Sequence, residues 1–128
     1  MNLSSATIGQ LMIPVDDFER GVAFYKNVLG LQFLFTAPPQ MAFFMCGDVR
    51  LLVGVMPEGR LAQRGSAIYF RVSDIKGVAS SLMEHGVAFL AEPHIVHRTP
   101  TMELWLAEFK DADGNSLSLM SEVARTDA

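Results

Sequence analysis

The chain has 128 residues, 50% of them hydrophobic and 19% charged, which argues for one globular domain and against a disordered segment. Its net charge of −4 and its lack of a Lys/Arg stripe argue against nucleic-acid binding. No apolar run reaches the roughly 18–20 residues that span a bilayer, and the N-terminus lacks the basic start and apolar centre of a signal peptide. We therefore expect a cytoplasmic protein without nucleic-acid or membrane partners, whose single cysteine, Cys46, forms no internal disulfide.

The first half of the chain predicts a strand, a helix and three further strands. The opening strand ends near Val15, and Asp17 is suited to cap the helix because its short carboxylate can accept free backbone N–H groups. We expect this helix to end at Gly30, a residue suited to the left-handed cap conformation. Its apolar positions recur at helical spacing, at Phe18, Val22, Tyr25 and Leu29. Strands are then predicted at residues 31–35, 41–45 and 50–55.

The second half repeats this order. Asp74 is the predicted N-cap of the second helix and Gly86 its predicted end. Apolar residues again recur at helical spacing, at Ile75, Val78 and Leu82. Strands are predicted at residues 87–90, 102–109 and 115–120.

The sequence therefore predicts an α+β fold made of two βαβββ modules. Module one spans about 7–55, residues 56–65 are the linker, and module two spans about 66–122, so that residues 1–128 form a single domain. Helices that alternate with hairpin-linked strands imply a curved mixed sheet with the helices on its outer face and the other face open.

The segments "VDDFERGVAFYKNVLGL" and "FKDADGNSLSLMSE", placed within this twofold pattern, resemble the vicinal oxygen chelate superfamily. That superfamily includes glyoxalases, bleomycin-resistance proteins and extradiol dioxygenases. The resemblance covers about residues 7–122 and implies that function resides on the open, concave face of the sheet. In the enzymes of the superfamily this face holds one divalent metal, with ligands from the first and last strand of each module.

The resemblance places the four metal-ligand positions on residues that are poor ligands. They fall on Gln10, Ala67, Ser118 and either Leu51 or Leu52, depending on how the hairpins are aligned. An amide oxygen can serve as a ligand, but leucine and alanine have no donor atom and a neutral serine hydroxyl is weak. We therefore expect no metal and no other cofactor.

Strand alternation predicts which side chains share the open face. If Gln10 faces the cavity, Met12 does too, and in module two Tyr69 and Arg71 do so beside Ser118. A lining of hydroxyls, an amide, methionine and aromatic residues is typical of a small-molecule pocket. The alternative is an ordinary sheet face partly covered by a partner subunit.

The densest polar cluster lies in residues 92–105. His94 and His97 have the H-x-x-H spacing of metal ligands, but we expect them in a loop without a third ligand nearby. Candidate ligand contacts are His97, Arg98, Glu103 and Trp105, because arginine can bind a carboxylate or phosphate and tryptophan can stack on a ring. The alternative is a solvated hairpin.

We hypothesise a homodimeric protein that binds a small molecule and has lost the usual metal ligands. The alternative is a lyase, isomerase or dioxygenase of the same superfamily, so that enzymatic activity stays open. Such an enzyme would hold a metal at unusual positions or use acid–base residues such as His97 and Glu103 without metal. A third possibility is a regulatory module with an exposed apolar patch.

Overall fold

The computed structural model describes residues 2, 4–5, 7–55 and 67–125. The chain separates into two compact units, Met1–Gln63 and Arg64–Ala128, which correspond to the two predicted modules. The predicted linker, residues 56–65, lies outside the described residues. No helix in the described part of the chain is long and apolar enough to cross a membrane.

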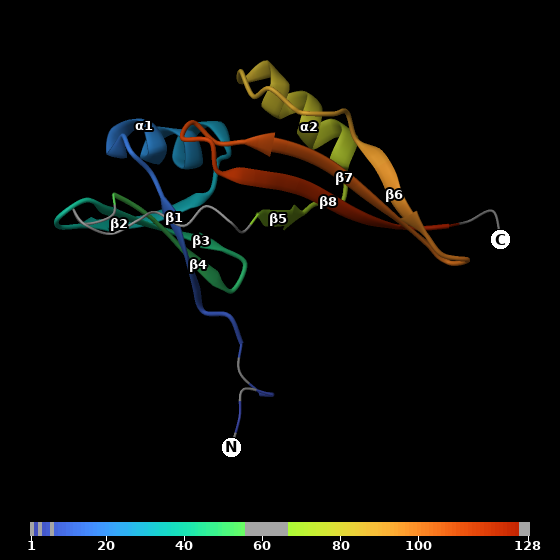
Figure 1. Cartoon of the computed structure of the whole chain (residues 1–128), viewed down its shortest axis with the longest axis horizontal. Helices are drawn as coiled ribbons and strands as arrows, with labels where there is room; N and C mark the ends of the chain where they lie inside the picture. The colour runs from blue at the N-terminus through green and yellow to red at the C-terminus, as the bar shows by residue number, and fades with distance from the viewer. Residues whose placement is uncertain (1, 3, 6, 56–66, 126–128) are drawn as a thin grey trace. The chain divides into compact units, whose positions relative to one another are not determined.

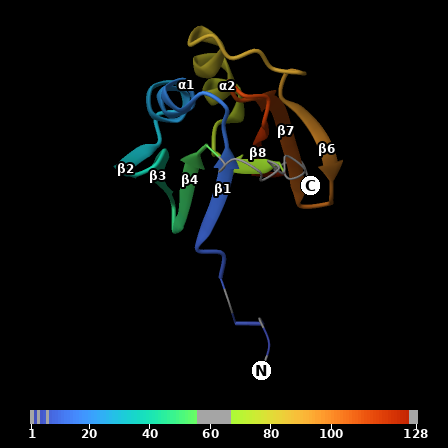
Figure 2. The same cartoon turned by 60° about the vertical axis from the view of Figure 1, so that its left-hand side comes forward.

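Module one is a four-stranded mixed sheet with its helical segment on one face (Figure 1). The strands lie in the order β1-β4-β3-β2, with β1 parallel to β4 and the other neighbours antiparallel, as Figure 2 shows from another side. The elements are β1 (Gln10–Pro14), α1 (Phe18–Ala23), the π-helix η1 (Phe24–Val28), β2 (Gln32–Ala37), β3 (Met41–Cys46) and β4 (Val49–Gly54).

Module two has the same topology, with strand order β5-β8-β7-β6 and α2 on one face of the sheet (Figure 1). Its elements are β5 (Ile68–Arg71), α2 (Ile75–Glu84), β6 (His94–Arg98), β7 (Met102–Lys110) and β8 (Ser116–Ala124). The equivalent strand orders confirm the α+β fold of two βαβββ modules.

The predicted helix caps are confirmed in both modules. The carboxylate of Asp17 accepts a hydrogen bond from the backbone N–H of Arg20 at 3.1 Å, and that of Asp74 accepts one from Gly77 at 3.1 Å. After the helices, Gly30 and Gly86 have φ angles of 70° and 92°. Residues with a Cβ rarely adopt this conformation, so these glycines allow the chain to turn back to the sheet.

The prediction of a strand at residues 87–90 is wrong, because the edge strand of module two is β6. Residues 87–90 contribute only an isolated bridge between Phe89 and Phe109, whose rings lie 5.0 Å apart. Val87 is buried, so the alternation in this segment reflects packing against the core and not a strand ladder. Pro93 has no N–H to donate, and β6 begins directly after it.

Each core lies between the helix and one face of the sheet. In module one the buried side chains of this layer include Ile13, Tyr25, Phe44, Leu51 and Val53. In module two α2 buries Ile75, Ala79 and Leu82, and the sheet contributes Ala107, Phe109, Leu117 and Leu119. Alternate residues on the same strands point to the opposite, open face.

This difference between faces predicts the cost of truncating a side chain. Leu51→Ala should lower the free energy of unfolding by about 2–5 kcal/mol, because the Leu51 side chain is 1% exposed and its loss leaves a cavity. Met12→Ala, in the neighbouring strand but 41% exposed, should cost less than about 1 kcal/mol. Urea denaturation of both variants measures the difference, and equal losses would contradict the assignment of faces.

Candidate functional site

The open face of module one is defined by the strand register. Directly paired residues lie on the same face, and the buried partners Leu51 and Phe44 face the helix. The residues between them therefore face the open side. We call this surface the first open face, and its members across the four strands include Gln10, Met12, Phe35, Met41, Phe43, Met45, Arg50 and Leu52.

An aromatic stack joins β3 to the edge strand β2 on the first open face. The rings of Phe35 and Phe43 are stacked, with centroids 4.6 Å apart and an angle of 25° between their planes. Phe35 is 47% exposed. Each ring covers one face of the other, and the exposed part of Phe35 leaves an apolar surface open to a ligand.

A β-bulge turns Phe35 toward this face. In β2, Phe33 pairs with Phe44 on the helix side, whereas Phe35 pairs with Phe43 on the open side, and the irregularity lies between the two. Without a bulge, residues two apart would share a face. The sequence analysis missed Phe35 and Phe43, although the alternation applied to Gln10 would have found Phe43 once the strand pairing was known.

Gln10, a predicted site residue, holds an arginine on the same face. Its side-chain oxygen accepts a hydrogen bond from Nε of Arg50 at 2.7 Å, and the Arg50 guanidinium carbon lies 5.3 Å from the centroid of the Phe43 ring. In β4, the strand that contains Arg50, the side chain on the open face is that of Leu52 and not that of Leu51. On the open face next to Gln10, β4 therefore carries the Arg50 guanidinium and the hydrocarbon side chain of Leu52.

The second open face belongs to module two and contains three predicted site residues, Tyr69, Arg71 and Ser118. Tyr69 pairs with Ser118, and Arg71 pairs with the next residue on the same side of β8, Met120. Tyr69 is 51% exposed, but Ser118 is 1% exposed and its hydroxyl is directed to the carbonyls of Ala107 and Leu119 at 3.3 and 2.9 Å. Tyr69 is thus open to a ligand, while the Ser118 hydroxyl already has protein partners.

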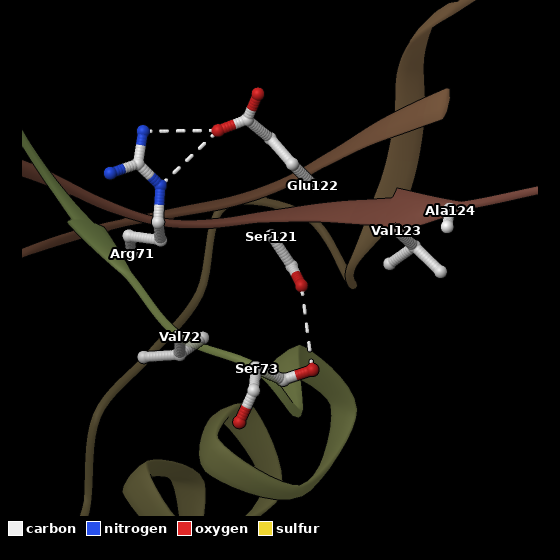
Figure 3. A pocket seen from close by; sticks show the side chains of 7 residues that line it. All are labelled: Arg71, Val72, Ser73, Ser121, Glu122, Val123 and Ala124. Atoms are coloured by element: carbon white, nitrogen blue, oxygen red, sulfur yellow. Dashed lines mark hydrogen bonds and ion pairs between the residues drawn. The ribbon is translucent and has the colours of Figure 1, made fainter. Parts of the chain in front are cut away.

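A hollow of about 450 Å³ lies where β5 ends beside β8 (Figure 3). Nε of Arg71 donates to the Glu122 carboxylate at 3.2 Å, and its terminal nitrogen lies 3.0 Å from the same oxygen. On the other side of β8, the Ser121 hydroxyl donates to the carbonyl of Ser73 at 3.5 Å (Figure 3). The predicted site residue Arg71 therefore has its charge balanced by a neighbouring carboxylate.

The predicted residues at 97–105 do not share one face. His97 pairs with Leu104 on the open side, whereas Trp105 pairs with Ile95 on the side of α2, where Lys76 Nζ lies 4.9 Å from the Trp105 ring centroid. A bulge between Ile95 and His97 causes this division, as the bulge in β2 does for Phe35.

Arg98 and Glu103 lie on the same side of the sheet as Trp105. Nε of Arg98 donates to the Glu103 carboxylate at 3.0 Å, and the indole N–H of Trp105 donates to its other oxygen at 3.4 Å. The Arg98 and Trp105 side chains therefore already have a hydrogen-bond partner in Glu103. The structure brings together three of the four residues of the predicted cluster and places His97 apart from them.

His94 and His97 lie in strand β6 and not in a loop, which corrects the earlier expectation. The bulge between them places both on the open side, opposite Leu106 and Leu104. Nδ1 of His94 lies 2.7 Å from the carbonyl of Glu92. Within the described ranges, no group of three or more His, Cys, Asp or Glu residues could hold a metal ion.

Cys46, at the end of β3, is the sole thiol of the chain. Partial burial raises the pKa of this thiol above its ordinary value. Because the thiolate is the nucleophilic form, a raised pKa leaves Cys46 largely unreactive at neutral pH. This supports a structural role for Cys46.

Comparison with solved structures places this fold among known proteins. A glyoxalase/bleomycin resistance protein/dioxygenase superfamily member from Sphaerobacter thermophilus DSM 20745 is 24% identical, with a TM-score of 0.73, covering 91% of this chain and 97% of the other. A lactoylglutathione lyase from Agrobacterium tumefaciens is 23% identical, with a TM-score of 0.70 and coverage of 91% and 93%. TnmS3, an antibiotic binding protein from Streptomyces sp. CB03234, is 21% identical, with a TM-score of 0.75 and coverage of 95% and 100%.

No significant match is found among curated proteins. The family model described as Glyoxalase/Bleomycin resistance protein/Dioxygenase superfamily matches residues 7–119, which include both modules. The matched range and the two βαβββ modules agree with the resemblance noted in the sequence. This chain belongs to the glyoxalase/bleomycin resistance protein/dioxygenase superfamily.

Proposed function

We propose that this protein binds a small organic molecule on its open sheet faces without using a metal. The observation that carries this proposal is the aromatic stack of Phe35 and Phe43 on the first open face, with Phe35 47% exposed. Ligand sites are mostly apolar surfaces with a few well-placed polar groups. Arg50 and Gln10 supply such groups beside the stack.

The residues at the superfamily's metal positions do not fit a divalent ion. Leu52 and Ala67 have no donor atom, the Gln10 oxygen already accepts from Arg50, and the Ser118 hydroxyl is directed to two carbonyls. None of these side chains carries negative charge, and Arg50 adds a positive charge beside Gln10. A dication placed there would lose its water shell without recovering that energy.

The structural relatives include both kinds of protein considered for this chain. TnmS3 is described as an antibiotic binding protein and another relative as a lactoylglutathione lyase. Acid–base catalysis by His97 and Glu103, the metal-free enzyme alternative, lacks geometric support, because these residues lie on opposite faces of the sheet. A lyase, isomerase or dioxygenase would have to use other groups.

We also propose that the protein is a homodimer. The edge strands β2 and β6 each contain a bulge, a feature that discourages pairing, whereas the registers of the edge strands β1 and β5 are regular. Regular edges can add a strand from another module. These edges favour association of modules within or between chains.

Ligand binding should raise the melting temperature, because the ligand stabilises only the folded state. We expect a thermal-shift screen of small metabolites to give a ligand whose binding is weakened by about 0.5–1.5 kcal/mol in Phe35→Leu, which loses the aromatic stack. Trp105→Phe, on the α2 side, should bind normally. The converse result, a loss only in Trp105→Phe, would place the ligand at the 97–105 hairpin, as the sequence analysis suggested.

Protein purified without chelator should contain no stoichiometric divalent metal. We expect this because the residues at the superfamily's metal positions are poor ligands. Elemental analysis by mass spectrometry measures the metal content per chain. Zinc, nickel, iron or manganese near one atom per chain, lost in Gln10→Ala, would restore the metalloenzyme alternative. The same measurement on Gln32→Ala, a variant of another glutamine in the same sheet, is the control.

Multi-angle light scattering should give a mass of twice the 14.1 kDa chain at micromolar concentration. Gly9 and Val15 bond to β4, so by alternation the N–H of Met12 points away from β4, and Met12→Pro removes a donor from the free edge of β1. Such a variant should dissociate if β1 forms the dimer contact. A concentration-independent mass of a single chain would disprove the dimer.

A further inference from the structure

We propose that the first open face recognises a flat aromatic molecule bearing one negative charge, of the class of aromatic carboxylates. This inference rests on the proposed function and adds the chemical class of the ligand. It depends on three properties of the face: its charge, the state of Arg50, and the orientation of its aromatic rings.

Among the described strand residues of the first open face, Arg50 is the one with a charged side chain. By the strand registers, the other described positions on this side of the sheet are glutamine, methionine, phenylalanine, leucine, alanine, proline and glycine. These described strand positions include no carboxylate on the side of Arg50. By contrast, Arg71 and Arg98 in module two each form an ion pair with a glutamate. Arg50 is therefore the cation whose charge a ligand can neutralise.

A hydrogen bond to Nε holds the Arg50 guanidinium in place and leaves its terminal nitrogens available to a ligand. Only its Nε is used, in the 2.7 Å hydrogen bond to Gln10, and no bond from its terminal nitrogens to the described residues is found. The guanidinium also lies over the Phe43 ring, at 5.3 Å from the centroid. A fixed, planar guanidinium beside an apolar surface binds a carboxylate well, because less side-chain entropy is lost and water screens the charge less.

The aromatic stack determines the shape of the ligand. Phe35 and Phe43 stack face to face and Arg50 lies over the Phe43 ring, so the pair offers a ligand its ring edges and the outer face of Phe35. Met12, on the same face in β1, is 41% exposed. Methionine adapts to the outline of a ring and contacts aromatic groups favourably. Because the face of one ring packs favourably on the edge of another, a planar ring system is better suited to this surface than a bulky aliphatic group.

A single positive charge favours a monoanion. A phosphate group with two negative charges would leave one charge uncompensated above apolar side chains, and such burial is costly. A carboxylate matches both the charge and the planar geometry of one guanidinium. The arrangement of Arg50 next to Phe43 would allow the ring and the carboxylate of one ligand to be bound together.

Calorimetric titration of the 128-residue chain tests this inference with three probes. Naphthoate is planar and anionic, naphthamide is planar and neutral, and cyclohexanecarboxylate is anionic but not planar. We expect naphthoate to bind at least about tenfold more tightly than either of the others, as expected for loss of a charged hydrogen bond or of stacking. Arg50→Met should remove the preference for naphthoate over naphthamide. Arg20→Met, the same substitution on the helix of module one, should retain it.

Methyl NMR of labelled methionine locates the bound probe. Naphthoate should shift the methyl signals of Met12, Met41 and Met45 on the first open face, while that of Met83, on α2, stays unchanged. Circular dichroism confirms that each variant is folded.

Two results would overturn the inference and remain distinguishable from failure of the proposed function. If naphthoate and naphthamide bind equally and shift the same methionines, the face binds aromatic molecules without selecting an anion. If naphthoate leaves those methionines unchanged, the assigned class is wrong. The metabolite screen, which does not depend on ligand charge, would then decide separately whether the protein binds small molecules at all.

Discussion

The structure depends on one constraint: in each module a single helix covers one face of a four-stranded sheet. Because side chains alternate along a strand, burying Leu51 and Phe44 against the helix directs Leu52 and Phe43 to the other side. The same alternation in module two buries Leu117 and Leu119. The core therefore lies on one face of the strands, and the other face stays open.

The two bulges modify this constraint at equivalent strands of the repeat. In β2 the bulge moves Phe35 to the open side, where it stacks on Phe43, and in β6 it moves His97 to the open side, away from Trp105. A bulge also disturbs the ladder of an edge strand and discourages pairing with other chains. One local irregularity thus serves both to direct a side chain and to protect an edge.

The chemistry of the faces differs between the modules. The first open face combines an arginine without a carboxylate partner and a pair of stacked rings, whereas the second open face carries the Arg71–Glu122 ion pair and the exposed Tyr69. Neither face offers a donor set suited to a divalent ion among its described residues. These properties favour recognition of an organic molecule over Lewis-acid chemistry.

The sequence by itself determined the repeat, the helix caps at Asp17 and Asp74, and the superfamily, because these follow from local periodicity, turn residues and short motifs. The resemblance indicated which face of the strands is open, and alternation within each strand then placed Gln10, Tyr69 and Arg71 on that face. Only the tertiary structure decided the position of β6, the side chains that share a face across strands, and which charges are paired. A bulge shifts the alternation by one residue, and neither the bulge nor the partner of an arginine is encoded in spacing alone, because both depend on segments that fold together from distant parts of the chain.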